Sequence, residues 1–241
     1  MDLWKFEHLE FESGIFGAPV GRVVSGDEAL FEMSQDWTSQ GVWLVSARVD
    51  KGDIEADEDL IKANFLPIET LVTLERALPK SEVMPSGVRV AIDGDIEESL
   101  LIARTAFKYD RFHADARVPN EAADRLKEKW VANGFSGRSD TVLVVEIGGS
   151  VVGFSTCMVN GDAAIIDLIA ISPNHQGRGV GKSLVQGVIA TYAGRSRVIR
   201  VGTQDANMHS LKLYHSCEFV QVTSQVSYQW VNNLKALEKL L

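Results

Sequence analysis

A glycine-rich bend in the second half of the chain is the stretch whose residues could do chemistry. It reads HQGRGVGKSL over residues 175–184 and joins a long apolar run to an amphipathic segment. Glycines at 177, 179 and 181 leave backbone N–H groups open to an anion. A helix that starts here adds unpaired N–H groups and the positive end of its dipole. With Arg178 and Lys182 as local charges, the pattern predicts a diphosphate site that needs no metal.

Two common nucleotide-binding patterns do not fit this bend. A P-loop that ends in Gly181-Lys182-Ser183 requires glycine at position 176, where this chain has Gln176. The glycine spacing also differs from the dinucleotide-binding fingerprint. A strand-to-helix turn that needs glycines only for its backbone geometry remains the structural alternative.

The elements that must position the bend are also readable from the sequence. Residues 163–172 are apolar almost throughout, which predicts a central strand covered on both faces. A helix is expected over 179–192, because its apolar residues recur at helical spacing. A strand over 197–203, a helix over 207–216, two closing strands over 218–223 and 225–230, and a terminal helix over 232–241 are expected to follow.

Upstream, the segment LPKSEVMPSG over 78–87 has the composition of a linker. We therefore expect a boundary near Pro85, with one domain over 1–85 and a second over 86–241. Helices are predicted over 96–107 and 119–133. Tight hairpins are expected at Gly148-Gly149 and at 160–162. Together these elements predict an α+β fold with a mixed sheet.

Composition narrows the classes of function. The chain has 241 residues, of which 24% are charged, and a formal net charge of −9. This charge argues against nucleic-acid binding and against adhesion to an anionic membrane. The sequence contains no apolar run of membrane-spanning length, and its acidic N-terminus is unlike a secretion signal. The two cysteines, Cys157 and Cys217, have no metal-ligand or disulfide spacing, which favours a reducing cytoplasm and no metal site.

Two separate motifs resemble the GNAT superfamily of N-acetyltransferases. Gln176, Gly179 and Gly181 match its Gln/Arg-x-x-Gly-x-Gly/Ala loop, and Asn207 and Tyr214 stand where that superfamily has an Asn and a Tyr downstream. The resemblance covers residues 88–230 and implies a GNAT acyl-CoA N-acyltransferase fold with acetyl-CoA as acyl donor. The coenzyme contacts that it implies are Ile169, Ala170 and Ile171 on the central strand, Gln176, Gly177, Arg178, Gly179, Val180, Gly181 and Lys182 on the bend, and Asn207.

The resemblance also implies a catalytic role for Tyr214, which is similar to the general acid of the superfamily. A phenol pKa near 10 and a thiol pKa of about 8.5 make the proton transfer cost only about 2 kcal/mol. A tyrosine packed in the core is the alternative. The general base is open between His113, Asp115 and Asp167, and water is a further carrier. One departure is Glu218 before Phe219, where many GNAT domains have glycine; it predicts a changed helix end.

Three stretches resemble, more specifically, the acetyltransferases of TDP-fucosamine and their relatives. They are FESGIFGAPVGRV (11–23), ARTAFKYDRFHAD (103–115) and VGTQDANMHSLKLY (201–214). Those enzymes place an incomplete GNAT-like half before a complete one, and the acceptor that they imply is a nucleotide-linked amino sugar. Arg111 would then meet acceptor phosphates, Phe112 would stack on a base or sugar, and Asp115 would line the same cleft. The alternative is that Phe112 belongs to the core and Arg111 to a surface ion pair.

Other functions remain open at this point. The acceptor could be another small amine, an amino acid, a peptide or an antibiotic. A non-catalytic acyl-CoA-binding module is a further alternative, which the presence of Tyr214 disfavours. The apolar closing strands and the incomplete first half leave sheet edges that a second copy of the chain could cover, so a homodimer is an expectation.

Overall fold

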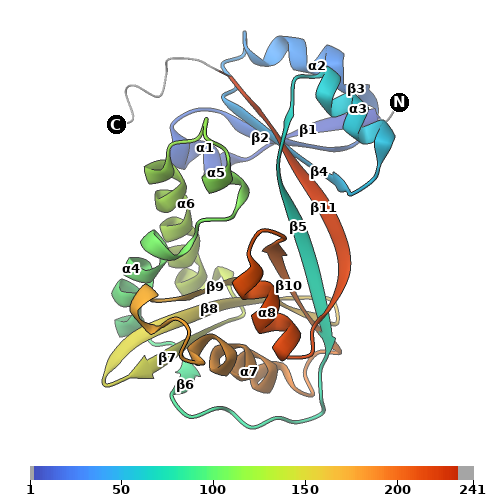
Figure 1. Ribbon diagram of the computed structural model, residues 1–241. Helices are drawn as coiled ribbons and strands as arrows, with labels where there is room; N and C mark the ends of the chain where they lie inside the picture. Colours follow the sequence, from blue (N-terminus) through green and yellow to red (C-terminus); the bar gives the residue numbers. More distant parts are fainter. Residues whose placement is uncertain (1–2, 233–241) are drawn as a thin grey trace. The chain divides into compact units, whose positions relative to one another are not determined.

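The computed structural model describes residues 3–232, and the terminal helix expected over 232–241 therefore falls outside the described residues except for Asn232. The chain forms two compact units (Figure 1). Unit 1 contains the described residues of 1–71, 111–122 and 224–241, and unit 2 contains residues 72–110 and 123–223. Of the described helices, none is long and apolar enough to cross a membrane.

This division differs from the boundary predicted near Pro85. It falls between Leu71 and Val72, inside the strand β5 (Leu66–Ala77), and the strand β11 (Val220–Val231) also contributes to both units. A continuous strand has no linker composition at the point where it passes from one unit to the next. The sequence of the strand therefore carries no signal for the change.

Unit 1 is a sheet with helices on its apolar face. Its strands follow the order β3-β1-β2-β4-β11-β5. Besides parts of β5 and β11, its elements are β1 (Leu3–His8), α1 (Glu10–Phe16), β2 (Val20–Ser25), β3 (Glu28–Ala29), α2 (Leu30–Trp37), β4 (Leu44–Asp50), α3 (Ile54–Lys62) and α5 (Arg111–Ala114). Trp37 of α2 and Leu60 of α3 pack with Val45 and Ala47 of β4 in one apolar cluster.

Unit 2 is a sheet in the order β5-β10-β9-β8-β7-β6, covered on both faces. Its elements are β6 (Val88–Val90), η1 (Asp93–Asp95), α4 (Ile96–Ala106), most of α6 (Asn120–Asn133), η2 (Gly134–Arg138), β7 (Thr141–Ile147), β8 (Ser150–Asn160), β9 (Ala163–Ile171), η3 (Pro173–His175), α7 (Val180–Tyr192), β10 (Val198–Gln204) and α8 (Met208–Ser216). The helices α7 and α8 share one apolar cluster with the sheet, and α4 and α6 share another.

The prediction of a central, doubly covered strand is confirmed in β9. This strand pairs in parallel with β10 and antiparallel with β8. Its pairing with β8 shifts so that Thr156 faces Leu168 and Cys157 faces Ile166, which leaves Asp167 as an extra residue in a β-bulge. Ile166 therefore packs with α7 and α8, whereas Leu168 packs with α4.

The prediction of two closing strands is wrong. Residues 220–231 form the single strand β11. The break expected at Ser224 does not occur, because the carbonyl of Ser224 accepts a hydrogen bond of 2.9 Å from the backbone N–H of Lys51. Ladder pairing of β11 with β4 then continues from Gln225 to Val231.

Candidate coenzyme and catalytic site

The glycine-rich bend is open at two of its three glycines. Gly177 has φ of 71° and Gly179 has φ of 83°, both in the left-handed region that favours glycine. A Cβ atom added at either position would meet no atom within 4 Å. The backbone here is therefore held in a conformation that side chains disfavour, beside space that a ligand can use.

The start of α7 presents unpaired donors at this bend. Gly179 is the N-cap of the helix, and the N–H of Ser183 donates to the Gly179 carbonyl at 3.0 Å. The N–H groups of Val180, Gly181 and Lys182 precede that bond and are the orphan donors of the first turn. The exposed side chains of Arg178 and Lys182 flank them. This arrangement suits a phosphate anion.

The third glycine, Gly181, allows close packing and does not border open space. A Cβ atom at Gly181 would lie 3.2 Å from Cδ2 of Leu213 and 3.8 Å from Cγ1 of Ile171. Leu213 belongs to α8 and Ile171 ends β9. Gly181 thus lets the first turn of α7 approach both elements, so the two motifs singled out in the sequence meet within unit 2.

The end of β9 exposes backbone groups next to the bend. Parallel pairing with β10 ends where Ile166 faces Val201, whereas β9 continues to Ile171. The N–H of Ser172 donates to Val152 of β8, so by the alternation of antiparallel pairs the backbone groups of Ile169 and Ile171 point away from β8. The Gln176 amide takes up one of them, because its Nε2 donates to the Ile171 carbonyl at 3.0 Å.

Asn207 caps the helix that carries Tyr214. Its Oδ1 accepts a hydrogen bond of 3.2 Å from the backbone N–H of Ser210, at the start of α8. This satisfies one of the orphan donors of the helix. The amide N–H groups of Asn207 are not used in this bond, so its predicted contact with the coenzyme stays a prediction.

Tyr214 lies in the apolar cluster beneath the bend. Its side chain is 2% exposed, and its ring centroid is 5.6 Å from that of Phe219. Among residues 3–232 its hydroxyl has no hydrogen-bond partner. Burial raises the pKa of the Tyr214 phenol well above its ordinary value, with a smaller contribution from Cys217. The phenol therefore keeps its proton at neutral pH and has a donor to offer.

Glu218 ends α8 in a conformation that favours glycine. Its φ is 64°. The N–H of Phe219 donates to Tyr214 and that of Glu218 to His215, the pattern of a Schellman C-cap. The carboxylate of Glu218 pairs with Arg76 at 2.9 Å. The residue that departs from the GNAT pattern thus adopts the backbone that a glycine would have there.

We expect Glu218→Gly to be more stable than Glu218→Ala by about 1 kcal/mol, because only glycine adopts this φ without strain. Both variants lose the ion pair with Arg76, so the difference isolates the backbone effect. Urea unfolding measures it, and acetyl transfer should be unchanged in both. An alanine variant as stable as the glycine variant would contradict the strain.

Two of the three candidate bases are engaged by arginines. Asp167 pairs with Arg138 at 3.1 Å. Asp115 is 3% exposed, and its carboxylate accepts hydrogen bonds of 2.9 Å and 2.7 Å from the Arg117 guanidinium. Neither carboxylate is therefore presented as an unpaired base. The residues that hold them, Arg138 and Arg117, were not singled out from the sequence.

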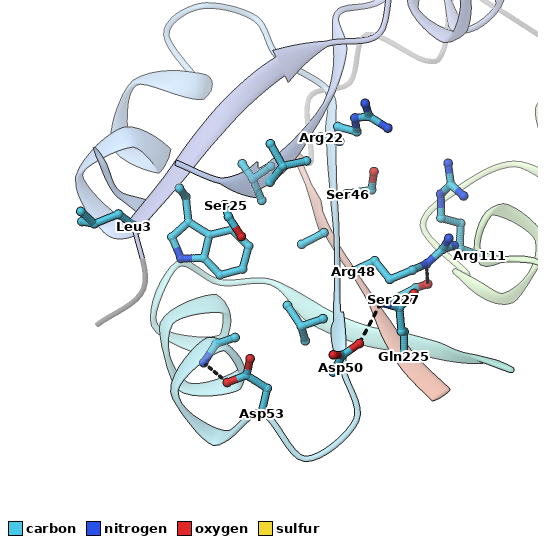
Figure 2. A pocket seen from close by; sticks show the side chains of 16 residues that line it. Leu3, Arg22, Ser25, Ser46, Arg48, Asp50, Asp53, Arg111, Gln225 and Ser227 are labelled. Atoms are coloured by element: carbon cyan, nitrogen blue, oxygen red, sulfur yellow. Dashed lines mark hydrogen bonds between the residues drawn. The ribbon is translucent and has the colours of Figure 1, made fainter. Parts of the chain in front are cut away.

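The residues predicted to bind the acceptor lie in unit 1. Phe112 is 1% exposed, with its ring centroid 5.6 Å from that of Phe16 and the Arg111 guanidinium 4.4 Å above it. The buried Phe112 ring thus already packs against Phe16 and Arg111, which favours the core alternative over the predicted stacking on a base or sugar. Asp115 is likewise closed off by Arg117, whereas Arg111 lines a cavity of unit 1 (Figure 2).

The fold and the bend define a class of enzyme. The family model for "Acetyltransferase (GNAT) family" matches residues 102–219. The chain is also 32% identical over 215 residues to the dTDP-fucosamine acetyltransferase of Escherichia coli O6:H1. The aligned region covers 86% of this chain and 90% of that protein. The chain therefore belongs to the GNAT acetyltransferases, and the predicted family, α+β fold and enzyme class are confirmed.

One further sequence relative and one solved structure are also similar to this chain. The chain is 28% identical over 138 residues to the spore coat polysaccharide biosynthesis protein SpsD of Bacillus subtilis. The aligned region covers 57% of this chain and 47%, about half, of the length of that relative. A GCN5-related N-acetyltransferase from Sphaerobacter thermophilus has the same fold. It has a TM-score of 0.63 at 14% identity, over 95% of this chain and 76% of that one.

Proposed function

We propose that this enzyme transfers the acetyl group of acetyl-CoA to the primary amine of a nucleotide-linked amino sugar. The observation that carries the proposal is the open bend at the start of α7, next to the helix that bears Tyr214. The relative that is 32% identical supports the acceptor class, because its name specifies a dTDP-linked amino sugar.

The bend supports the choice of acyl donor. A diphosphate is an acceptor of hydrogen bonds, and the first turn of α7 offers the N–H groups of Val180, Gly181 and Lys182. Arg178 and Lys182 add positive charge to a chain whose net charge is −9. The backbone groups of Ile169 and Ile171, where β9 has left β10, suit the amides of a pantetheine arm.

In the proposed reaction the acetyl group passes directly from the coenzyme to the amine, and groups of this chain assist the transfer. The amine nitrogen forms a bond to the acetyl carbonyl carbon as the carbon–sulfur bond breaks. A backbone N–H of β9 stabilises the charge that develops on the carbonyl oxygen. Tyr214 donates its phenol proton toward the departing sulfur, and the proton lost by the amine passes to water. Since burial raises the pKa of Tyr214, its main contribution is a hydrogen bond that strengthens as charge develops on sulfur.

Acetyl transfer to paired acceptors tests the acceptor class. With acetyl-CoA present, we expect kcat/KM for a dTDP-linked 4-amino-4,6-dideoxy sugar to exceed that for the free amino sugar by about 100-fold or more, since binding energy from the nucleotide is lost with the free sugar. Thiol release and the mass of the product provide the measurement.

Three further kinds of compound serve as controls. A dTDP-linked sugar with a hydroxyl in place of the amine should give no thiol release above hydrolysis. Amino acids and aminoglycosides should be poor acceptors. Faster acetylation of either of these than of every nucleotide-linked amine tried would refute the proposed acceptor while leaving the acetyltransferase class intact.

A further inference from the structure

The β-bulge in the central strand of unit 2 lies where β9 separates from β10. At the bulge two residues of β9, Asp167 and Leu168, occupy the space opposite one residue of β8, Thr156. Parallel pairing with β10 ends at Ile166, immediately before the bulge. Beyond it, from Leu168 to Ile171, β9 continues its pairing with β8. A bulge bends its strand and increases the local twist, which accounts for the separation.

A threonine hydroxyl serves the backbone at this bulge. The N–H of Leu168 points toward β8, because the N–H of Ser172, four residues further on, donates to Val152 of β8 and antiparallel pairs alternate. This Leu168 N–H donates to Oγ1 of Thr156 at 3.1 Å. The Thr156 side chain therefore adds a hydrogen-bond acceptor where the bulge disturbs the ladder.

Close packing fixes the orientation of the Thr156 side chain. The residue is buried, and a Cβ atom added at Gly134 would lie 2.9 Å from its Cγ2 atom. Glycine at this position thus lets the segment η2 approach the threonine methyl group. The side chain of threonine has few rotamers, so a methyl group held against η2 also holds the hydroxyl against β9.

The segment η2 also contacts the extra residue of the bulge. Arg138, at the end of η2, pairs with the carboxylate of Asp167 at 3.1 Å, and the two side chains are 45% and 28% exposed. An ion pair with this exposure contributes little, because water competes for both charges. The hydrogen bond from Leu168 to Thr156 is buried, and a buried donor without its acceptor is costly. Thr156 is therefore the stronger determinant of the bulge geometry.

The bulge geometry sets the direction of the next backbone donor along β9. Ile169 follows Leu168, and its N–H points away from β8, on the side where pairing with β10 has ended. The peptide groups that carry the two N–H groups are planar and meet at the Cα atom of Leu168. A change in the direction of the Leu168 N–H therefore also changes that of the Ile169 N–H.

We infer that Thr156 is a positioning residue for acetyl transfer: by holding the Leu168 N–H, it aims the Ile169 N–H at the thioester carbonyl of the acetyl donor. The Ile169 N–H is then the backbone donor that stabilises the charge on the carbonyl oxygen. The Ile169 carbonyl and the backbone of Ile171 remain for the pantetheine amides. This inference rests on the proposed function, because it requires acetyl-CoA to lie along β9.

Thr156→Val tests this inference, because valine keeps the shape of threonine and removes the acceptor. We expect kcat to fall about 10-fold or more, since a misdirected donor stabilises the charged carbonyl oxygen less well. The Kd for CoA, which has no acetyl carbonyl, should change by less than about 2-fold. Thiol release under steady-state conditions gives kcat, and isothermal titration gives the Kd.

The stretching frequency of the thioester carbonyl is a second measurement, which a purely structural role of Thr156 would not change. A hydrogen bond to a carbonyl oxygen lowers this frequency. We therefore expect acetyl-CoA, isotopically labelled at the carbonyl carbon, to absorb at a higher frequency when bound to Thr156→Val than when bound to wild type. Infrared difference spectra of the two complexes provide the comparison, and no acceptor amine is required.

Two matched variants separate positioning from loss of packing. Thr156→Ser keeps the hydroxyl but loses the methyl group beside Gly134, so we expect a lower melting temperature with kcat within about 3-fold of wild type and an unchanged carbonyl frequency. Thr191→Val removes a hydroxyl that donates to the Gly187 carbonyl at 2.8 Å inside α7. This variant should keep the wild-type kcat and carbonyl frequency.

The inference and the proposed function fail in different ways. A wild-type kcat or a wild-type carbonyl frequency in Thr156→Val would overturn the inference alone. Equal losses of kcat in Thr156→Val and Thr156→Ser would also overturn it, because lost packing would then explain both. If the carbonyl frequency rises in Thr156→Val but no nucleotide-linked amine is acetylated, the proposed acceptor is refuted and the positioning role is retained.

Discussion

Tyr214→Phe should lower kcat about 100-fold or more while leaving the KM for acetyl-CoA nearly unchanged. General-acid groups typically contribute factors of this size. Phenylalanine fills the same volume, so the apolar cluster around Tyr214 and Phe219 should persist, and the variant removes little besides the hydroxyl. Because burial raises the pKa of Tyr214, the wild-type enzyme should also show no loss of kcat from ionisation of this phenol below about pH 10. Steady-state kinetics over pH 6–10 measure both effects.

Tyr192→Phe is the matched control for this prediction. Tyr192 is fully buried in the same apolar cluster, and its hydroxyl donates to Asp140 at 2.7 Å. Losing that bond should cost about 1 kcal/mol of stability without lowering kcat. Equal kcat in Tyr214→Phe and wild type would reduce Tyr214 to a core residue, which is the alternative that its 2% exposure allows.

Gly179→Val should raise the Kd for acetyl-CoA by about 30-fold. A valine is strongly disfavoured at φ of 83°, so the bend must either bear about 2 kcal/mol of strain or change conformation. Its side chain would also fill the open space beside the N–H groups of the first turn of α7. Isothermal titration with acetyl-CoA, or with CoA as a non-reactive probe, gives the affinity.

Gly161→Val separates backbone strain from loss of binding. Gly161 has φ of 60° in the hairpin between β8 and β9, and a Cβ atom there would also meet nothing within 4 Å. We therefore expect Gly161→Val to lower the free energy of unfolding about as much as Gly179→Val does, while its affinity for acetyl-CoA stays at the wild-type value. Equal losses of affinity in the two variants would show that the bend at Gly179 has no special part in binding.

Local sequence was sufficient to predict those features whose signal lies in consecutive residues. The bend over 175–184 required glycine at φ values that other residues avoid, and the apolar run over 163–172 required burial on both faces. Both features were readable, and with Asn207 and Tyr214 they indicated the family. Phe112 was ambiguous, because an aromatic residue next to an arginine has the same local pattern whether it packs against Phe16 or against a ligand.

The amino-acid sequence by itself determined the family, the α+β class and the order of most elements, because these depend on propensity, periodicity and backbone requirements of short segments. Only the tertiary structure decided which charged groups are paired with each other. Asp167 and Asp115 pair with Arg138 and Arg117, and the cavity of unit 1 is lined by arginines from three separate elements. The strand register that joins Arg48 to Ser227 links residues 179 positions apart, a distance over which local sequence carries no information.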